Sequence, residues 1–333
     1  MKTFKFIDLF CGIGGFHVAA DLVARRQGLK AKCVLASDID HDAQVIYEAN
    51  FGIKPVGDIT KVEALSVPDH DILFAGFPCQ AFSIIGDKKG FDDTRGTLFF
   101  DVARILAEKK SASFVLENVK GLRGHDGGRT LSVILNTLDQ LGYWVDYRVL
   151  NALDYGLPQK RERILIVGFL NGHQSNFSWP AQGNQVEKSL DEILEPNEHV
   201  DAKYFASEKI RISRLDAVSG KLRPSTRTIW HENKSGNISM LPYSCALRAG
   251  ASYNYLLVDG VRRMTEREMF RLQGFPEEFK LVGSYQSLRK QAGNSVPVAM
   301  IDAVVDAVVS ATMKKPSKSE LKPSKVQPAL FAS

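Results

Sequence analysis

The sequence of 333 residues has only four cysteines, and no two of them form a C-x-x-C pair. Nor do histidines stand near them at metal-ligand spacing, so the pattern excludes a disulfide framework and a structural zinc site. A single reactive thiol, without a metal ion, is the interpretation that remains.

The sequence also lacks any apolar run of the roughly 18 residues that a membrane span requires. Its first residues show no signal-peptide pattern. With 44% hydrophobic and 24% charged residues, the composition is typical of a globular protein. We therefore expect a cytoplasmic protein without membrane association, with one large domain and one smaller one.

Acidic residues are scarce in two regions, although the net charge is only +5. Residues 314–333 contain five lysines and one glutamate among prolines and serines, a composition that predicts a basic disordered tail. Between Lys203 and Gly250, nine basic residues stand with three acidic ones. Such an excess is usually a solvated face, but interleaved aromatic and amide side chains favour nucleic-acid contact here, because phosphates attract cations and base edges bind forked polar groups.

Cys79 stands just past residues 71–75, an apolar run that predicts a buried parallel strand. In an open α/β sheet, ligands bind at the carboxyl ends of the strands, so this cysteine is a candidate nucleophile. The alternative is an inert core cysteine, since cysteine is among the most buried residue types. Pro78 before it and small polar residues after it predict a mobile loop that ends at Thr97.

A glycine turn follows the first predicted strand, Phe4 to Phe10, and precedes a predicted helix that begins at Phe16. Strand, glycine turn and helix form the geometry that lets a nucleotide-like ligand approach the backbone. The fingerprint is incomplete, because His17 stands where the third glycine belongs. Asp38 follows the second predicted strand, where dinucleotide folds place an acid on the ribose. Asp58 could accept a hydrogen bond from an adenine amino group or cap the next helix.

Glu117 follows another predicted strand, residues 113–116, and should emerge at the same sheet edge as Cys79. Partial desolvation there would raise the pKa of its carboxyl group and let it hold a proton near neutral pH. A surface glutamate or a helix cap is the alternative. Arg161 and Arg163 lie at the start of the last predicted strand of this region. Side chains two residues apart in a strand point to the same side, so one of these guanidinium groups can reach the cleft at the sheet edge.

Six segments, in their order along the chain, resemble the motifs of the DNA cytosine-C5 methyltransferases of bacterial restriction-modification systems. They are residues 6–16 for the S-adenosyl-L-methionine (AdoMet) motif, 76–83 (GFPCQAFS) for the nucleophile motif, 117–119 for the glutamate motif, 159–168 for the arginine motif, and 262–276 and 291–297 for the last two. The resemblance covers about residues 4–310 and fades between 171 and 260, where members of the family read different DNA sequences.

The resemblance implies an α/β fold with an AdoMet-dependent methyltransferase (Rossmann-like) sheet, mostly parallel, with helices on both faces, plus a smaller target-recognition domain. Residues 1–170 would form the catalytic AdoMet-binding domain and residues 171–275 the DNA-binding target-recognition domain. Residues 276–313 would return to pack a helix on the first domain, and residues 314–333 would form the basic tail.

The activity implied by the resemblance is methyl transfer from AdoMet to C5 of a cytosine flipped out of a specific short duplex DNA sequence. Cys79 would add to C6 of the base, Glu117 would protonate N3, and Arg163 would stabilise the ring oxygen. Arg161 would assist or contact a phosphate. The product of the cofactor would be S-adenosyl-L-homocysteine, and no metal would take part.

Contacts with the cofactor and with DNA are also implied by the resemblance, residue by residue. Phe16 and Ile39 would sandwich the adenine, Asp38 would hold the ribose, and Asp58 with Ile59 would read the adenine edge. The other expected cofactor contacts are Phe10, Gly12, Gly14, Gly15, Gly76, Pro78, Leu98, Asn294 and Ser295. The expected DNA contacts are Ser83, Arg95, Arg227, Lys234 and Arg248.

Two departures from the family pattern weaken particular contacts. Ala246 stands where the family usually has threonine, so a phosphate contact is absent or made by Ser244. Position 39 is often tryptophan in the family, so stacking of the adenine on Ile39 should be weaker.

The implied partners are double-stranded DNA and, functionally, a cognate restriction endonuclease, and the enzyme is expected to be monomeric. A transfer-RNA cytosine-C5 methyltransferase is the nearest alternative, but such enzymes carry a Cys-Phe-Thr segment that this sequence lacks after the arginine motif. A zinc cytosine deaminase needs P-C-x-x-C, and Pro78-Cys79 has no second cysteine ligand. A binding protein that has lost catalysis is disfavoured by the intact Cys79, Glu117 and Arg163.

Overall fold

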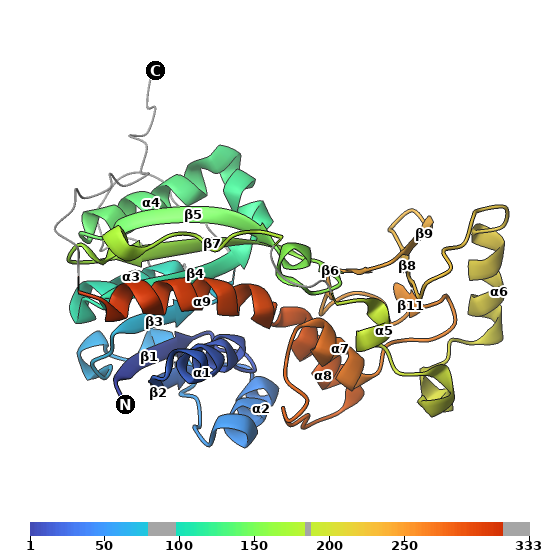
Figure 1. The fold of residues 1–333 in the computed structure, drawn as a ribbon, viewed down its shortest axis with the longest axis horizontal. Coiled ribbons are helices and arrows are strands. Elements are labelled where there is room, and N and C mark those ends of the chain that lie inside the picture. Colours follow the sequence, from blue (N-terminus) through green and yellow to red (C-terminus); the bar gives the residue numbers. More distant parts are fainter. Residues whose placement is uncertain (79–97, 184–187, 316–333) are drawn as a thin grey trace. The chain divides into compact units, whose positions relative to one another are not determined.

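The computed structural model describes residues 1–78, 98–183 and 188–315, so Cys79, Ser83 and Arg95 lie outside the described residues. The principal sheet has the order β2-β1-β3-β4-β7-β5. Its strands are β1 (Thr3–Leu9), β2 (Lys30–Ser37), β3 (Ile72–Ala75), β4 (Ser113–Val119), β5 (Trp144–Asn151) and β7 (Glu162–Phe169). Strands β2, β1, β3 and β4 are parallel, and β7 runs antiparallel to β4 (Figure 1). The mostly parallel α/β sheet predicted from the sequence is thereby confirmed.

Helices cover both faces of this sheet, as the continuous apolar strands require. Helices α3 (Leu98–Lys109) and α4 (Arg129–Gln140) bury their apolar stripes in one core with residues of β1, β3, β4 and β7. Helices α1 (Gly15–Gln27) and α9 (Val298–Met313) lie over the other face (Figure 1). Arg26 of α1 pairs with Asp302 and Asp306 of α9 at 3.1 and 2.9 Å. Helix α2 (His41–Phe51) follows β2 and is capped by Asp40.

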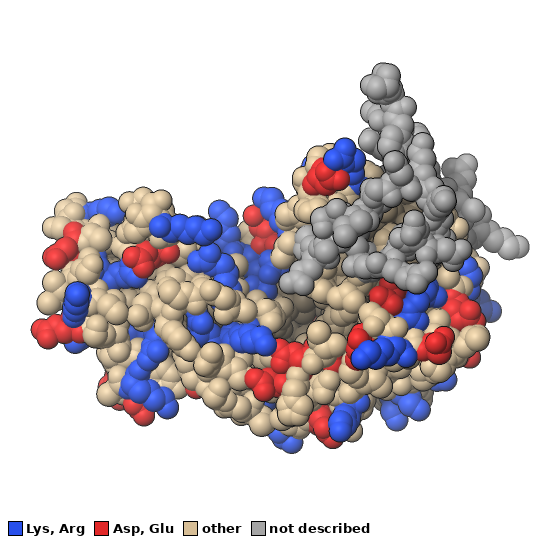
Figure 2. Space-filling model, turned by 180° about the vertical axis from the view of Figure 1, so that it is seen from behind, with Lys and Arg blue, Asp and Glu red and all other residues tan. Residues whose placement is uncertain are grey.

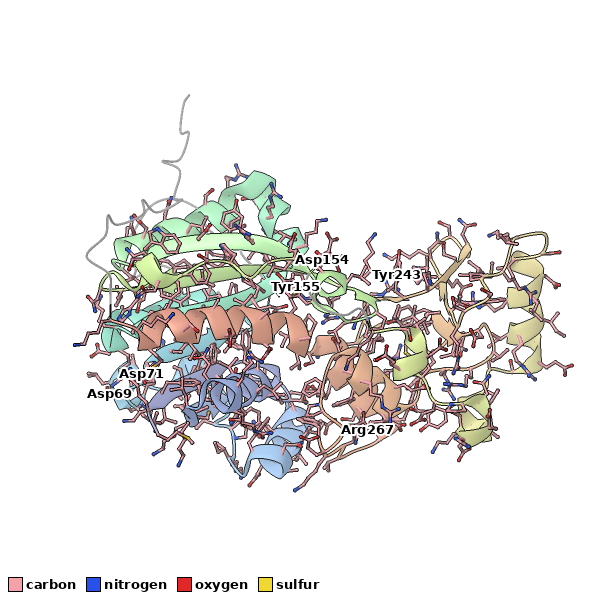
Figure 3. The ribbon with its side chains drawn as sticks, in the orientation of Figure 1. Asp69, Asp71, Asp154, Tyr155, Tyr243 and Arg267 are labelled. Atoms are coloured by element: carbon pink, nitrogen blue, oxygen red, sulfur yellow. The ribbon has the colours of Figure 1, made fainter. Side chains whose placement is uncertain are left out.

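The register at the start of β3 is supported by a side chain that crosses to the neighbouring strand. Asp71, just before β3 (Figure 3), accepts a hydrogen bond from the backbone nitrogen of Lys5 in β1 at 2.7 Å. In this register Phe6 pairs with Ile72, and the two strands end together at Leu9 and Ala75.

The chain forms two compact units that do not follow a single cut in the sequence. The first unit contains residues 1–150, 162–180 and those from 301 on, and the second contains residues 151–161 and 181–300. Residues 151–161 thus group with the second unit, whereas the sequence predicts them within the domain of residues 1–170. The assignment of AdoMet binding and DNA recognition to separate domains stays a prediction.

The second unit contains a small antiparallel sheet in the order β11-β8-β9. Its strands are β8 (Ile229–Glu232), β9 (Ile238–Leu241) and β11 (Leu256–Val258), and the short strands β6 (Gln159–Lys160) and β10 (Ser244–Cys245) pair with each other. Its helices are α5 (Leu190–Ile193), α6 (Glu208–Ala217), α7 (Glu266–Leu272) and α8 (Tyr285–Asn294). Trp230 packs in its core with Val218 and Ile238.

Two charged residues of the segment 262–268 form a buried ion pair. Arg262 and Glu268 are both fully buried and lie 2.8 Å apart. Glu268 also completes a capping box with Thr265, which starts α7. Because loss of either partner would leave a buried unpaired charge, this part of the predicted motif is needed for the fold of the second unit.

Among the described residues, no single helix is both long and apolar enough to cross a membrane, and only the bent pair α8 and α9 passes that test together.

Candidate active site

The strand ends that carry the predicted catalytic motifs meet at one edge of the principal sheet. Because β1, β3 and β4 are parallel, their carboxyl ends lie side by side, and the antiparallel β7 brings its amino end to the same edge. Ala75 pairs with Leu9 and with Leu116, and Val119 pairs with Arg163. Ligands bind outside the carboxyl ends of strands in such sheets, so this edge is the candidate active site.

Glu117 and Arg163 form an ion pair at this edge, with 2.7 Å between Oε1 and Nε. Both side chains are largely buried, with 11% and 14% of their surface exposed. A Cβ atom on Gly76 would lie 3.6 Å from the second carboxylate oxygen of Glu117. Asn118 donates to the carbonyl of Phe77 at 2.8 Å. The glutamate motif therefore contacts the first residues of the segment GFPCQAFS, whose Cys79 lies outside the described residues.

Arg161 has a different environment from the one expected. Strand β6 ends at Lys160 and β7 begins at Glu162, so the strand alternation assumed from the sequence does not apply. The Arg161 side chain belongs to the second unit, is 1% exposed, and donates to the carbonyls of Leu247, Gly293 and Ser295 at 2.9, 2.9 and 2.6 Å. Arg161 thereby joins Leu247 to the C-terminal end of α8 within its own unit, and its expected catalytic or phosphate-binding role stays a prediction.

The predicted glycine turn is present between β1 and α1, and its conformation requires glycine. Gly12 and Gly14 have φ values of +52° and +88°, which only glycine adopts readily. A Cβ atom on Gly14 would also lie 2.3 Å from the ring of Phe51. The backbone nitrogen of Cys11 donates to the carbonyl of Ser37 at 2.9 Å, which joins the turn to the end of β2.

Asp38 holds this glycine loop from the neighbouring strand end. One carboxylate oxygen accepts from the backbone nitrogen of Gly12 and the other from that of Asp40, both at 2.8 Å. Burial raises the pKa of Asp38 above its usual value. The adjacent Ile39 side chain is 76% exposed, so an apolar group stands in solvent beside the loop. A bound ligand with an apolar face would remove that group from water.

Phe16, the residue expected to contact the adenine, is buried in the first unit, and the contact stays a prediction. Its side chain is 4% exposed, and its ring stacks on Phe74 with 5.2 Å between centroids. The aromatic side chain at the edge is instead Phe10, which is half-buried and has a positive φ of 55° at the end of β1. Ile59 is also a core residue, with 2% of its surface exposed.

The remaining expected cofactor residues take varied positions. Asp58 caps a short 3-10 helix and accepts from the backbone and hydroxyl of Thr60, contacts that lower the pKa of Asp58. The cap is therefore present, and contact of Asp58 with an adenine stays a prediction. Gly15 and Leu98 are the first residues of α1 and α3, and Pro78 is exposed. Asn294 and Ser295 lie at the end of α8 in the second unit.

Asp8 is a buried residue of the site that the sequence analysis missed. It lies in β1, has no exposed surface, and among the described residues neither carboxylate oxygen has a hydrogen-bond partner. Burial, and then the nearby charge of Asp38, raise its pKa well above the usual value. The sequence indicates this residue by a carboxylate at position 8, within the apolar strand that precedes the glycine turn.

His17 replaces the third glycine because it fills space between α1 and α2. Its ring stacks on Phe51 with 3.9 Å between centroids, and its Nδ1 lies 2.7 Å from the Tyr47 hydroxyl. Its Nε2 is 3.9 Å from Asp21. Burial lowers the pKa of His17 to about 4. The imidazole is therefore neutral at pH 7 and packs as an aromatic side chain.

The lowered pKa of His17 predicts a loss of stability in mild acid. The unfolded chain takes up this proton near pH 6.5, whereas the folded protein resists it down to about pH 4, so stability falls as pH falls through that window. The free energy of unfolding should drop by about 2 kcal/mol more in the wild type than in His17→Gln between pH 7 and pH 5. Urea unfolding of both proteins at the two pH values measures this, and equal drops would contradict it.

The residues of the second unit that are predicted to contact DNA differ in their exposure and in the partners of their side chains. Arg227 pairs with Asp259 at 3.2 Å and donates to the carbonyl of Glu195 at 3.1 Å, so its side chain serves the fold of this unit. Lys234 is exposed in the turn between β8 and β9. Arg248 is also exposed and lies 4.8 Å from the centre of the Tyr255 ring. Figure 2 shows Lys and Arg side chains spread over the visible face of this unit, with acidic side chains between them.

Comparison with known proteins adds to this geometry. The family model for C-5 cytosine-specific DNA methylase matches residues 4–310. The type II methyltransferase M.NgoBI of Neisseria gonorrhoeae is 54% identical over 302 residues, which cover 90% of this chain and 91% of that protein. The type II methyltransferase M.HhaI of Haemophilus parahaemolyticus is 40% identical and covers 94% of this chain and 96% of its own length.

A solved structure agrees at the level of the fold. The Entamoeba histolytica methyltransferase EhMeth matches 95% of this chain and 100% of its own with a TM-score of 0.68, at 18% identity. The sequence matches reach much higher identity over nearly the whole length and carry the family assignment. The chain therefore belongs to the C-5 cytosine-specific DNA methylase family.

Proposed function

We propose that this protein transfers a methyl group from AdoMet to C5 of a cytosine within a specific short sequence of double-stranded DNA, as the modification enzyme of a restriction-modification system. The observation that carries the proposal is the buried Glu117–Arg163 ion pair, which lies beside Gly76 at the start of the nucleophile segment. An acid and a cation held together at a ligand-binding sheet edge suit a reaction that builds charge on a heterocycle.

The residues around the glycine loop fit AdoMet. Gly12 and Gly14 let a ligand approach the backbone, and Asp38, fixed by two backbone nitrogens, can accept from ribose hydroxyls. Ile39 and Phe10 provide apolar surface for an adenine ring, beside the contact expected from Phe16. Asp8 adds a buried carboxyl group that has no hydrogen-bond partner among the described residues. When bound, AdoMet supplies the electrophilic methyl group.

Three side chains of this protein carry out the proposed reaction. C5 of cytosine is a weak nucleophile, so the Cys79 thiolate forms a bond to C6 and makes C5 electron-rich. With the base bound, the protonated form of Glu117 donates its proton to N3 as negative charge develops there and becomes the carboxylate paired with Arg163, which also stabilises charge on the ring oxygen. After methylation, loss of the C5 proton expels the Cys79 thiolate. We assign no side chain to that deprotonation, and water can serve as the base.

The substrate base must leave the duplex before these groups can reach it. Flipping costs a few kcal/mol, which contacts with the DNA backbone must offset. We place those contacts in the second unit, where Lys234 and Arg248 are exposed, together with Ser83 and Arg95 of the predicted loop. The proposal also includes a monomeric enzyme and a cognate restriction endonuclease, and the similarity to type II methyltransferases supports the DNA substrate.

Release of tritium from DNA labelled at C5 of cytosine tests the proposed reaction. We expect AdoMet-dependent release from duplex DNA, none from transfer RNA, and none when AdoMet is omitted. Release from transfer RNA alone would favour the RNA methyltransferase, and conversion of cytosine to uracil without AdoMet would favour a deaminase. Methylation-sensitive sequencing of DNA from an expressing host would then identify the recognised sequence.

A further inference from the structure

Arg104 of helix α3 binds two backbone carbonyls of the connection between β2 and β3, and neither the proposed reaction nor the expected cofactor contacts include it. Its Nη1 donates to the carbonyl of Val62 at 2.7 Å, and its Nη2 donates to that of Ile59 at 2.6 Å. Its Nε donates to Asp101 of the same helix at 2.9 Å. Each of the three guanidinium nitrogens therefore has an acceptor, and the planar group fixes the bound backbone in direction as well as in position.

The two carbonyls belong to the short 3-10 helix that Asp58 caps. This helix spans Ile59–Lys61, and Val62 is the residue that ends it. Arg104 thus binds the carbonyl of its first residue and that of its C-cap. The Ile59 side chain is 2% exposed and packs in the core to which α3 contributes. Asp58 is therefore tied to helix α3 through the backbone of its neighbour Ile59.

Asp58 can cap this helix and still accept a hydrogen bond from a ligand. Both hydrogen bonds from Thr60 go to Oδ1, at 3.0 Å from the backbone nitrogen and 2.7 Å from the hydroxyl. Oδ2 lies 3.8 Å from the ammonium nitrogen of Lys61, whose side chain is 81% exposed. An exposed ion pair of this length is weak, so another donor can replace it. The Asp58 side chain is itself 36% exposed, so a ligand can reach Oδ2 from solvent.

We propose that Arg104 is a positioning residue that sets how strongly the cofactor site prefers adenine to other purines, because it holds Asp58 where the carboxylate accepts from the exocyclic amino group. This inference rests on the proposed function, since AdoMet must be the cofactor. A carboxylate fixed for this contact rejects a base that lacks the donor, whereas a mobile carboxylate can turn to water. Helix α3 also begins with Leu98, so Arg104 joins two of the segments that are expected to contact the cofactor.

Binding of two ligands related to the cofactor product tests the proposal without catalysis. They are S-adenosyl-L-homocysteine and S-inosyl-L-homocysteine, in which an oxygen atom replaces the amino group of the adenine. Calorimetry should show that the wild type prefers the adenine ligand. In Arg104→Gln the Kd for the adenine ligand should rise about tenfold, the value expected for one hydrogen bond to a charged group, while the Kd for the inosine ligand changes by less than about twofold. The KM for AdoMet should rise by a similar factor, and kcat at saturating AdoMet should stay near that of the wild type.

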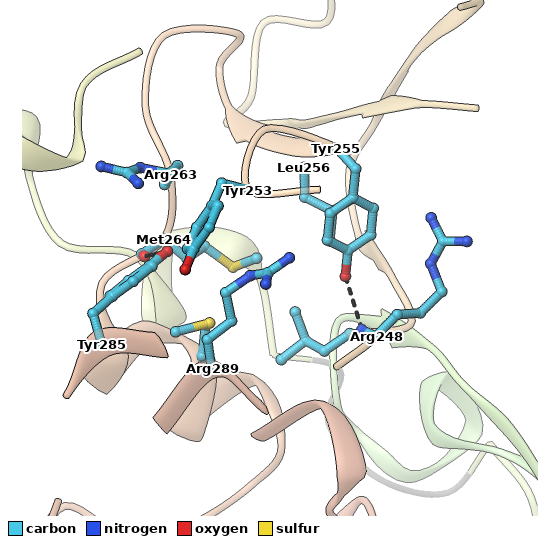
Figure 4. Close-up of a pocket in the computed structure, with 10 residues that line it drawn as sticks. Arg248, Tyr253, Tyr255, Leu256, Arg263, Met264, Tyr285 and Arg289 are labelled. Carbon is cyan, nitrogen blue, oxygen red and sulfur yellow. Dashed lines mark hydrogen bonds between the residues drawn. The ribbon is translucent and has the colours of Figure 1, made fainter. Parts of the chain in front are cut away.

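Two control variants make the same kind of change elsewhere. Lys109 lies in the same helix and donates at 3.1 Å to the carbonyl of Leu65, which belongs to the same connection but lies beyond the 3-10 helix. Arg289 of the second unit also donates to two backbone carbonyls, at 2.6 and 2.8 Å, and Figure 4 shows it beside the ring of Tyr253. Lys109→Gln and Arg289→Gln should both keep the wild-type ratio of the two Kd values.

Failure of this inference is distinguishable from failure of the proposed function. A wild-type protein that binds neither AdoMet nor the two ligands would contradict the function itself. A wild type that binds both ligands alike, or an Arg104→Gln variant with wild-type Kd values, would contradict the inference alone. An equal loss for both ligands would also contradict it, because that result indicates a general loosening of the fold. If Arg104→Gln does not fold, Arg104→Lys replaces it: one ammonium group reaches only one of the two carbonyls, and an unchanged ratio in this variant would overturn the inference.

Discussion

Cys79→Ser should abolish methyl transfer while DNA binding survives. A serine hydroxyl has no comparable anionic fraction near pH 7 and is a far weaker nucleophile than a thiolate, so addition to C6 would stop. Binding should persist because the contacts with phosphates and bases do not involve this side chain. Transfer of a radiolabelled methyl group to DNA measures the first effect, and fluorescence anisotropy of a labelled duplex measures the second.

Covalent trapping gives the decisive control for this variant. DNA that contains 5-fluorocytosine should hold the wild-type enzyme in a stable adduct, because the fluorine at C5 blocks the elimination that normally frees the thiol. Cys79→Ser should form no adduct that survives denaturing electrophoresis. If the variant kept the adduct, another residue would be the nucleophile.

Glu117→Gln should slow methylation on the order of 100-fold or more, the typical size of a general-acid contribution. The amide can still hydrogen-bond to Arg163 and fit beside Gly76, so the site should keep its shape. It cannot transfer a proton to N3, however. Single-turnover rates measure the loss, and AdoMet affinity should change little because the glutamate does not belong to the glycine loop.

Glu162→Gln is the matched control for this prediction. Glu162 is the first residue of β7, immediately before Arg163, and pairs at 2.8 Å with Lys120, whose side chain is 55% exposed. The same chemical change at this position should leave the rate near that of the wild type. If Glu117→Gln also matched the wild type, Glu117 would be a structural partner of Arg163 and not an acid.

Much of the fold follows from local patterns in the sequence. The strand around residues 71–75 and the helix that begins near Phe16 are both present, because apolar runs and glycine turns act over a few neighbouring positions. The parallel order of the strands then places Glu117 at the edge where the segment of Cys79 begins. That part of the candidate site was predictable from strand ends alone.

The partners of individual side chains depended on the tertiary structure. Arg161 was expected near the reacting base, but its guanidinium binds carbonyls 86, 132 and 134 residues away in the chain. Phe16 stacks on Phe74, and Arg227 pairs with Asp259, also across long separations. The residue pattern of one helix or strand does not predict which distant group will contact a given side chain.

The sequence by itself determined the family, the α/β architecture and the identity of Cys79, Glu117 and Arg163 as candidates, because these depend on residue types and their order. Only the tertiary structure decided that Asp8 is buried without a partner among the described residues and that Arg263 and Arg289 both lie against the ring of Tyr253. The physical reason is that burial and uncompensated charge are properties of a three-dimensional neighbourhood, and that neighbourhood is assembled from segments far apart in the chain.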